Sequence, residues 1–401
     1  MIEIVDGCTG RPSEGATRPF RVLMMCGGFL PGFRYGGPVR SLVRIVDTVS
    51  DRIDLTLVTR DRDLATPDPY PGLSGRWVRR GGSRVFYMDP SSIRHWRRLW
   101  REFRVTSFDL LYVNSLFSLF SIIPIVAARL GVIRVARILV APRGELKRGA
   151  LSSKRWKKEP FLWLWMPLLK VAGVVWHATS DREAADIRRA CRWARIEVNG
   201  SQVSLPLEPL PVPAAGDGVA RLVFISRISP EKNLDLALRA LQRASTVLEF
   251  DIYGPLEDAG YWKKCKSLLD DLPSNVRVRY CGELNPDEVR STFVNYDVFV
   301  FPTVGENFGH VIAESLSASC PVICSDQTPW TDVLDTGGGV VLRALAPEPL
   351  AEELDRIGAM EPADRLHARH AAAHAYRLWR RRSDGPNILE QARQSEWVRH
   401  P

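Results

Sequence analysis

Short apolar runs and amphipathic stretches alternate along this chain of 401 residues, and the alternation occurs twice. In the first half, apolar runs typical of buried strands lie at residues 20–26, 54–59, 83–88, 108–113, 135–141 and 173–177. In the second half they lie at residues 221–226, 249–253, 276–281, 298–301 and 321–325. Strands that alternate with helices predict parallel sheets with helices on both faces. The predicted fold class is therefore α/β, with two doubly wound, Rossmann-like domains.

A stretch rich in proline and glycine, Leu205 to Gly218, separates the two halves and is typical of a linker. The predicted N-terminal domain is then residues 1–204 and the C-terminal domain residues 219–368. Residues 369–401 form a basic tail that could return to the first domain. Ligands of doubly wound sheets bind at the carboxyl ends of the strands, so we expect the domains to face each other across a cleft lined by those ends.

One uncharged segment, Leu110 to Ala128, is nearly long enough to cross a membrane. It contains Asn114, Pro124 and three serines, which favours a buried strand at 108–113 followed by a helix at about 116–130. No sustained apolar stretch precedes Arg21, so no signal peptide is expected. Seven cysteines without metal-ligand spacing predict reduced thiols and a cytoplasmic protein.

The charge is unevenly distributed along the chain. Residues 1–200 carry 34 Lys and Arg against 18 Asp and Glu, whereas residues 201–401 carry 21 against 28. In the basic half the cations interleave with Trp96, Trp100, Trp156, Trp163 and Trp165, a composition found where proteins rest on anionic membranes. Solvated helices with a buried aromatic side explain the same pattern. No nucleic-acid-binding motif is present, so nucleic acid is not an expected partner.

Two cations mark a predicted phosphate site in the second half. Arg227 follows an apolar strand, and Lys232 lies in the first turn of the helix predicted to begin at Ser229-Pro230. Backbone N–H groups and the helix dipole favour an anion at such a junction. Ion pairs of these cations with Glu231 or Asp235 are the structural alternative.

Two carboxylates follow in a later strand–loop–helix unit. Glu306 is expected in the loop and Glu314 about two turns into the helix, with Asn307-Phe308-Gly309 between them. Carboxylates accept hydrogen bonds from hydroxyls, and the amides of residues 307–309 could donate to sugar or phosphate oxygens. Cations that can bind a diphosphate, next to carboxylates that can accept hydrogen bonds from hydroxyls, predict a nucleotide-sugar pocket. Solvated surface carboxylates are the alternative.

These motifs resemble those of GT-B-fold glycosyltransferases of the retaining family 4 type (glycosyl transferases group 1). The resemblance covers about residues 22–357 and rests on Glu306-(seven residues)-Glu314, Arg227-(four residues)-Lys232 and Gly36-Gly37-Pro38. It implies that Arg227 and Lys232 hold the donor diphosphate, that Glu306 contacts the donor sugar and that Glu314 accepts hydrogen bonds from ribose. Gly36 and Gly37 would let the backbone of the first domain approach the diphosphate.

The chain departs from this family pattern in the first domain. Many members have a histidine after the strand at 135–141, where this chain has Pro-Arg-Gly-Glu, so Arg143 could supply a cation to the cleft instead. His177 ends another strand, and either packing or a ligand contact explains it. The Gly-rich turn after the strand at 249–253 is reduced to Gly254-Pro255.

Together the residues and the resemblance predict a retaining hexosyltransferase that uses a nucleoside-diphosphate sugar. The expected acceptor is a hydroxyl of a lipid-linked or surface glycan in polysaccharide biosynthesis, reached in the cytoplasm or at the inner face of the membrane. No metal or other cofactor is expected, since Arg227 and Lys232 can replace Mg²⁺ as counter-charge. The alternatives are a nucleotide-sugar epimerase, a sugar phosphorylase or a non-catalytic glycan-binding module. The loop at 27–32 lacks G-x-G-x-x-G spacing, which argues against a dinucleotide-binding oxidoreductase.

Overall fold

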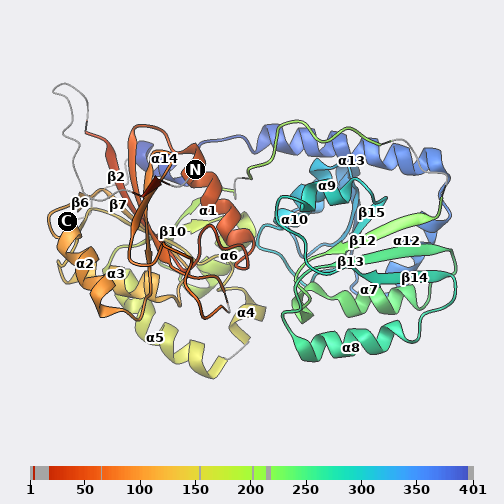
Figure 1. The fold of residues 1–401 in the computed structure, drawn as a ribbon, viewed down its shortest axis with the longest axis horizontal. Coiled ribbons are helices and arrows are strands. Elements are labelled where there is room, and N and C mark those ends of the chain that lie inside the picture. Colours follow the sequence, from red (N-terminus) through yellow and green to blue (C-terminus); the bar gives the residue numbers. More distant parts are fainter. Residues whose placement is uncertain are drawn as a thin grey trace. The chain divides into compact units, whose positions relative to one another are not determined.

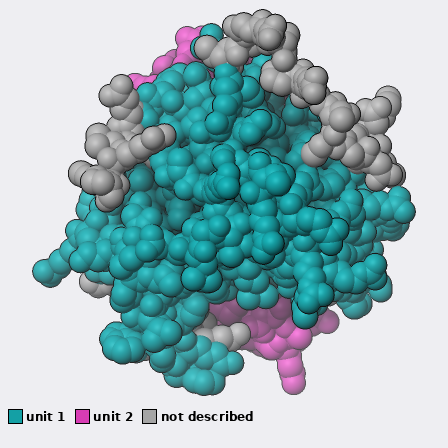
Figure 2. All heavy atoms as spheres, turned by 90° about the vertical axis from the view of Figure 1, so that its left-hand side faces the viewer, with its two compact units in different colours: residues 1–204, 385–401 teal, residues 205–384 magenta. Residues whose placement is uncertain are grey.

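The computed structural model describes residues 3–4, 18–64, 66–152, 155–200, 203–213 and 218–395. The chain forms two compact units: unit 1 comprises residues 1–204 and 385–401, and unit 2 comprises residues 205–384 (Figures 1 and 2). The predicted linker belongs to unit 2, where the amide of Leu210 donates to the carbonyl of Ser317 (2.7 Å) and the hydroxyl of Ser319 donates to the carbonyl of Leu210 (2.7 Å). Residues 214–217 of this stretch lie outside the described residues.

The predicted tail at 369–401 is divided between the units. Residues 369–382 are the end of one long helix, α13 (Pro362–Arg382), which stays in unit 2 because Arg369 and Tyr376 are buried there. Only the segment from residue 385 belongs to unit 1, where helix α14 (Ile388–Gln394) places Ile388, Leu389 and Ala392 in the core. Residues 396–401 lie outside the described residues.

Over the described residues, unit 1 is built on a nine-stranded sheet with the order β1-β4-β5-β3-β2-β7-β9-β10-β11. All neighbouring strands are parallel except at β4, which pairs antiparallel with β1 and β5. The strands are β1 (Glu3–Ile4), β2 (Phe20–Cys26), β3 (Ile53–Arg60), β4 (Trp77–Arg80), β5 (Ser83–Met88), β7 (Leu110–Asn114), β9 (Ile138–Ala141), β10 (Val175–Ala178) and β11 (Arg195–Val198). Two short strands, β6 (Ser107–Phe108) and β8 (Arg134–Val135), form a separate parallel pair.

Helices cover both faces of this sheet (Figure 1). They are α1 (Gly37–Thr48), α2 (Ile93–Phe103), α3 (Leu119–Arg129), α4 (Arg148–Ser152), α5 (Arg155–Val171), α6 (Asp181–Ala190) and α14. Alternate residues of β2 point to opposite faces, as expected for a strand. Leu23 and Met25 therefore pack in one core cluster with α2, α3, α5 and α6, whereas Met24 packs in the other with α1 and α14.

The interpretation of the five tryptophans of the basic half as membrane anchors is wrong for two of them. Trp96 and Trp165 are only 8% and 6% exposed and belong to the core cluster beneath α2 and α5, so they cannot anchor a membrane. Trp100 is half-buried and stacks on Trp96, with 5.2 Å between the ring centroids. Trp156 and Trp163 are 74% and 78% exposed. The rotation of each helix against its core decides this difference, because residues on one helix face the sheet or solvent according to their angle.

Unit 2 is built on six parallel strands with the order β14-β13-β12-β15-β16-β17 among the described residues. They are β12 (Ala220–Ile225), β13 (Leu248–Tyr253), β14 (Val276–Tyr280), β15 (Val298–Phe301), β16 (Val322–Ser325) and β17 (Gly339–Leu342). The chain first runs outward from β12 to β14 and then returns to β15 beside β12. The helices that follow β12 and β15, α7 (Leu234–Leu241) and α10 (His310–Ser317), therefore leave the sheet on opposite faces, and doubly wound folds bind their ligands at such a switch point.

The helices of unit 2 lie in two groups, one along each face of the sheet (Figure 1). In one group, α7 (Leu234–Leu241) packs against α8 (Ala259–Leu269) and α12 (Pro347–Gly358). In the other, α10 (His310–Ser317) packs against α9 (Val289–Phe293) and α13. Shorter turns complete the unit: a 3₁₀ turn at Pro230–Lys232, α11 (Thr331–Val333) and a π turn at Leu334–Gly338.

The uncharged segment at 110–128 forms β7 and α3, as predicted from its polar residues. Among the described helices, none combines the length and the apolar character that crossing a bilayer requires. Six cysteines of the described residues are free thiols, and all of them except Cys281 are buried.

Candidate functional site

The predicted phosphate site lies at the switch point of unit 2, but its local structure differs from the prediction. Ser229-Pro230 opens a single 3₁₀ turn rather than an α-helix, and α7 begins only at Leu234. Asn233 separates the two in a left-handed conformation (φ 60°), and its side-chain amide donates to the carbonyl of Pro302 (3.0 Å). This hydrogen bond joins the loop after β12 to the end of β15.

A buried ion pair joins the two predicted motifs directly. The ammonium group of Lys232 donates to Oε1 of Glu306 at 2.6 Å, and the two side chains are only 8% and 15% exposed. The alternatives in which Lys232 pairs with Glu231 or Asp235, or in which Glu306 is a solvated carboxylate, are therefore wrong. The loops are also tied by their backbones, since the carbonyl of Glu231 accepts hydrogen bonds from the Thr303 hydroxyl and the Val304 amide, both at 3.0 Å.

The second predicted cation is paired more loosely. Arg227 donates from Nη1 to Oε1 of Glu257 at 2.6 Å, with about two fifths of each side chain exposed (39% and 41%). Gly254 lets the loop after β13 pass beside this position. Its φ is 141°, and a Cβ there would lie 1.8 Å from the carbonyl oxygen of Ser226, so only glycine fits.

The loop before α10 is held by an aromatic cluster. The indole N–H of Trp330 donates to the carbonyl of Phe308, and the rings of Phe308, Trp330 and Trp379 pack with centroid separations of 5.5 and 4.5 Å. A Cβ on Gly309 would lie 3.5 Å from Cγ of Glu306, so the carboxylate loop passes close to the start of α10. Asn307 lies between these residues in the same loop.

Glu314 lies within α10 and is only 8% exposed. It is therefore not the solvated surface carboxylate of the alternative interpretation. Glu306 and Glu314 belong to one loop–helix unit that follows β15. The structure thus brings Arg227, Lys232, Glu306 and Glu314 to the loops and helix that follow β12 and β15.

The predicted residues of unit 1 lie at the carboxyl edge of its own sheet. This sheet also has a switch point, between β2 and β7. Gly36 follows β2 with a φ of 67° and precedes α1, whose first residue is Gly37. The loop is fixed by Asp63, whose carboxylate accepts hydrogen bonds from the amides of Phe33 (3.0 Å) and Arg34 (3.2 Å).

Arg143 is the centre of a polar network at this edge. Its guanidinium donates from Nε and Nη2 to Oδ1 of Asn114 (3.0 and 2.8 Å) and from Nη2 to the hydroxyl of Tyr112 (2.9 Å). Among the described residues, Arg143 makes no ion pair with a carboxylate. Its positive charge is held in place by neutral oxygens, which leaves it available to an anion.

His177 extends the network into the core. Its Nδ1 lies 2.8 Å from the hydroxyl of Tyr112, and its Nε2 lies 2.9 Å from the carbonyl oxygen of Asn199. Burial, together with the charge of Arg143, lowers the pKa of His177 to about 4. Burial raises the pKa of Tyr112 to about 12. His177 is only 2% exposed and both of its ring nitrogens lie near protein oxygens, which favours the packing interpretation of this residue.

Nearby carboxylates complete this edge by binding backbone amides. Glu183 accepts hydrogen bonds from the amides of Gly144 and Thr179, both at 2.7 Å. Glu145 accepts them from the Ser115 hydroxyl (2.7 Å) and the Leu116 amide (2.5 Å), and burial raises its pKa. These carboxylates fix the loops after β7, β9 and β10.

Several of these residues were missed by the sequence analysis: Tyr112, Asn114, Glu145, Glu183 and Glu257. Ser180 and Glu183 have the spacing of a capping box, and the Ser180 hydroxyl accepts a hydrogen bond from the Glu183 amide at 3.2 Å. The contact of Glu183 with Gly144 crosses from one loop to another, so no local spacing could have indicated it. A polar residue at the end of an otherwise apolar strand, as at Asn114, was the available signal.

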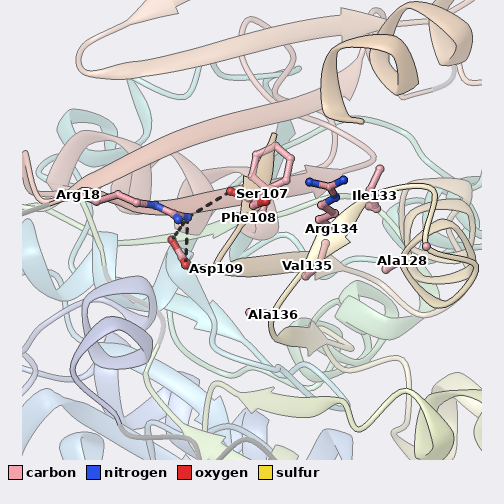
Figure 3. A pocket seen from close by; sticks show the side chains of 10 residues that line it. Arg18, Ser107, Phe108, Asp109, Ala128, Ile133, Arg134, Val135 and Ala136 are labelled. Atoms are coloured by element: carbon pink, nitrogen blue, oxygen red, sulfur yellow. Dashed lines mark hydrogen bonds and ion pairs between the residues drawn. The ribbon is translucent and has the colours of Figure 1, made fainter. Parts of the chain in front are cut away.

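A hollow of about 460 Å³ in unit 1 lies away from this edge. It is lined by the starts of strands, with Arg18 donating to Asp109 at 3.3 Å and to the Ser107 carbonyl at 3.5 Å (Figure 3). Ligands of doubly wound sheets bind at the opposite ends of the strands. The hollow therefore does not belong to the predicted site. No group of three or more His, Cys, Asp or Glu side chains in the described part of the chain is arranged to hold a metal ion.

Residues 212–374, which lie within unit 2, match the sequence profile of the family described as "Glycosyl transferases group 1". Unit 2 carries a glycosyltransferase domain. A D-inositol 3-phosphate glycosyltransferase of Nocardiopsis dassonvillei is 31% identical over 184 residues, or 42% of each chain. The O-antigen chain mannosyltransferase B of Escherichia coli is 29% identical over 143 residues, or 33% of this chain and 36% of that one. The matches thus span less than half of these relatives.

Solved structures resemble this chain over both of its units. HepE of Anabaena, crystallised with UDP and glucose, gives a TM-score of 0.66 at 15% identity over 94% of this chain and 100% of that one. Sucrose-phosphate synthase of Thermosynechococcus elongatus gives a TM-score of 0.68 at 14% identity over 93% and 98%. The predicted GT-B fold is confirmed by this likeness.

Proposed function

We propose that this chain is a retaining hexosyltransferase that moves a sugar from a nucleoside diphosphate to the hydroxyl of a lipid-linked or surface glycan. The observation that carries the proposal is the buried Lys232–Glu306 pair at the switch point of unit 2. A diphosphate supplies the negative charge that Lys232 requires, and a sugar supplies the hydroxyls that Glu306 can accept. One ligand that contains both groups is a nucleotide sugar.

The ion pair provides a simple exchange when the donor binds. Without a ligand, Lys232 and Glu306 neutralise each other, which limits the cost of burying either charge. In the proposed complex, Lys232 turns toward the donor diphosphate and Glu306 accepts hydrogen bonds from the sugar. Arg227, which pairs with the partly exposed Glu257, joins Lys232 at the diphosphate. Glu314 accepts hydrogen bonds from ribose, and the amides of residues 307–309 donate to sugar or phosphate oxygens.

The proposed reaction is a front-face substitution. The bond between the anomeric carbon and the phosphate oxygen breaks, and the acceptor oxygen bonds to the same face of that carbon. The acceptor proton moves to the leaving diphosphate. Negative charge grows on the diphosphate during this step, so cations fixed before the reaction stabilise the transition state more than the ground state. We propose that Arg227 and Lys232 supply this charge without a metal ion.

Unit 1 contributes a second positive charge in this proposal. Arg143 is held toward the carboxyl edge of its sheet by Asn114 and Tyr112, and no carboxylate of the described residues pairs with it. We propose that it contacts an anionic group of the substrate, while Gly36 and Gly37 allow the backbone to approach the diphosphate. The domain family and the named relatives, which include a mannosyltransferase, support sugar transfer. The structural neighbour that binds UDP supports a nucleotide-sugar donor.

The identity of the donor is tested first by thermal shift. UDP-, GDP- and ADP-sugars are added separately to the purified protein, and the sugar that raises the melting temperature most is selected. That donor is then incubated with lipid-linked glycan acceptors, and the anomeric configuration of the product is determined by NMR. Retained configuration with release of nucleoside diphosphate supports the proposal. Epimerisation of the sugar, phosphorolysis by added phosphate, or binding without turnover would instead identify one of the alternatives.

A further inference from the structure

Helix α5 of unit 1 presents an apolar surface to solvent. Six residues of this helix that carry no charge are exposed: Trp156, Pro160, Trp163, Leu164, Pro167 and Val171. The exposed fractions of the two tryptophans are 74% and 78%, that of Leu164 is 71% and that of Val171 is 67%. Large apolar side chains that gather on one surface commonly mark an interaction site. We call these six residues the outer stripe of α5.

The outer stripe is a continuous band on the helix. At 3.6 residues per turn its six members lie within about 100° of one another around the axis. The opposite side of α5 is also apolar and is used in folding, since Trp165 and Leu169 are buried in the core cluster. The stripe is therefore additional to the surface that attaches α5 to unit 1, and the fold does not explain it.

Cations border the outer stripe on both sides. By helical angle, Lys157 lies at one margin and Lys170 at the other, with Glu159 next to Lys170, and all three side chains are exposed. The ammonium group of Lys157 lies 4.7 Å from the ring centroid of Trp156. Helix α2, which packs on the same core cluster, adds exposed arginines at positions 94, 97 and 101. Tryptophan and leucine flanked by cations match an interface between anionic headgroups and acyl chains.

We propose that the outer stripe of α5 docks on the surface of an anionic lipid bilayer. The tryptophans and Leu164 enter the headgroup boundary, and Lys157 and Lys170 contact lipid phosphates. Pro160 and Pro167 are compatible with a position at the headgroup level. Each proline lacks an N–H group, so the carbonyls of Trp156 and Trp163 lose their helical hydrogen-bond donors. Water can bind these carbonyls at the headgroup level but is absent from the hydrocarbon core.

A second copy of the chain fits the stripe less well. A symmetric contact would place the same surface against itself and bring the lysines at positions 157 and 170 of one copy close to the lysines of the other. Like charges in close apposition oppose association, whereas anionic lipid neutralises them. This inference does not depend on the proposed reaction, because it concerns a surface of unit 1 and can be measured without a substrate.

The test is sedimentation with vesicles of equal parts phosphatidylcholine and phosphatidylglycerol, compared with vesicles of phosphatidylcholine alone. Wild type should sediment with the mixed vesicles at low salt and be largely released at high salt. Replacing Trp163 and Leu164 by serine should lower the partition coefficient about tenfold or more, because both side chains lose apolar contact with lipid. The matched control is Val247→Ser, which removes an apolar residue of unit 2 that is 57% exposed and should change nothing.

Charge is tested separately by the double variant Lys157→Glu and Lys170→Glu. It should lower binding to the mixed vesicles at least tenfold at low salt, whereas the control Lys263→Glu, an exposed lysine of α8, should not. Unchanged melting temperatures and circular dichroism spectra of all variants show that they are folded. Equal sedimentation of wild type and the Trp163/Leu164 variant would overturn the proposal. Concentration-dependent dimers that the same variant abolishes, without vesicle binding, would identify a second copy as the occupant and also overturn it.

Discussion

The cations at the carboxyl edges of the two sheets differ in the groups that they contact. In unit 2, Lys232 and Arg227 each pair with a carboxylate, Glu306 or Glu257. In unit 1, Arg143 is held by the neutral oxygens of Asn114 and Tyr112. A cation paired with a carboxylate can exchange that partner for a ligand. A cation fixed by neutral groups keeps both its position and its charge.

This difference suits the two parts of the proposed reaction. The leaving diphosphate gains charge during transfer, so cations that move from a carboxylate to the diphosphate follow the change. A fixed guanidinium is better suited to orienting a substrate group whose charge stays constant. The comparison therefore predicts that variants of unit 2 affect turnover, whereas variants of Arg143 affect how the substrate is positioned.

The largest effect is expected from the unit 2 cations. Lys232→Ala and Arg227→Ala should each raise the barrier to transfer by about 2–4 kcal/mol, mainly as a lower kcat, because charge grows at the leaving group. Steady-state kinetics with the selected donor measures this. Near-normal turnover in either variant would contradict the assignment.

Stability can be separated from catalysis at the buried pair. Lys232→Ala alone leaves Glu306 without its cation and should lower the free energy of unfolding by about 3 kcal/mol. Adding Glu306→Gln removes the unpaired charge and should restore most of the melting temperature without restoring turnover. Arg227→Ala is the comparison, because its exposed pair should contribute less than about 1 kcal/mol.

Arg143 sharpens the contrast between the units. Arg143→Ala should slow transfer by about 10- to 100-fold, as expected for a hydrogen-bonded charge, while free nucleoside diphosphate binds as in wild type. Arg143→Lys should recover only part of this rate, because lysine keeps the charge but not the planar fork. Calorimetry with the nucleoside diphosphate is the second measurement. A loss of nucleotide affinity equal to that of Lys232→Ala would show that both edges bind the same group.

The neutral network of unit 1 predicts a dependence on pH. The pKa of His177 is about 4 in the folded protein and near 6.5 when exposed, so only the unfolded chain gains a proton between these values. The free energy of unfolding should therefore fall as pH decreases below about 6.5, by about 2 kcal/mol at pH 5.

Urea unfolding across this pH range measures the effect. His177→Gln should flatten the pH dependence, whereas His370→Gln, which replaces an exposed histidine of α13, should leave it as in wild type. Arg143→Ala should also reduce the slope, because the charge of Arg143 lowers the pKa of His177. An unchanged slope in His177→Gln would show that other groups cause the loss of stability at low pH.

The smallest effect distinguishes the two glutamates of unit 2. Glu314→Gln should weaken binding of free nucleoside diphosphate about tenfold, since its proposed contact is ribose. Glu306→Gln should leave that binding nearly unchanged and reduce transfer, since its proposed contact is the sugar. Calorimetry and kinetics on both variants test the split, and the opposite pattern would reverse the two roles.

The sequence by itself determined the strands, most helices and the motifs of unit 2. Apolar runs and proline or glycine positions are local signals, and they located β12 and β15 and the loops that follow them within a few residues. The sequence also placed Arg227, Lys232, Glu306 and Glu314 after strands that a doubly wound fold brings to one edge. The sequence did not predict the 3₁₀ turn at Lys232. The hydrogen bond from Asn233 to Pro302 that accompanies this turn joins residues 69 positions apart, so no local pattern indicates it.

Only the tertiary structure decided how charges are partnered and which aromatic residues are exposed. The contacts of Lys232 with Glu306 and of Arg143 with Asn114 join residues 74 and 29 positions apart, so no local spacing predicts them. Whether a tryptophan of α2 or α5 meets the sheet or solvent depends on how each helix is rotated against its core. The sequence shows that cations and tryptophans occur together in the first half of the chain. Packing buries Trp96 and Trp165 and leaves Trp156 and Trp163 exposed.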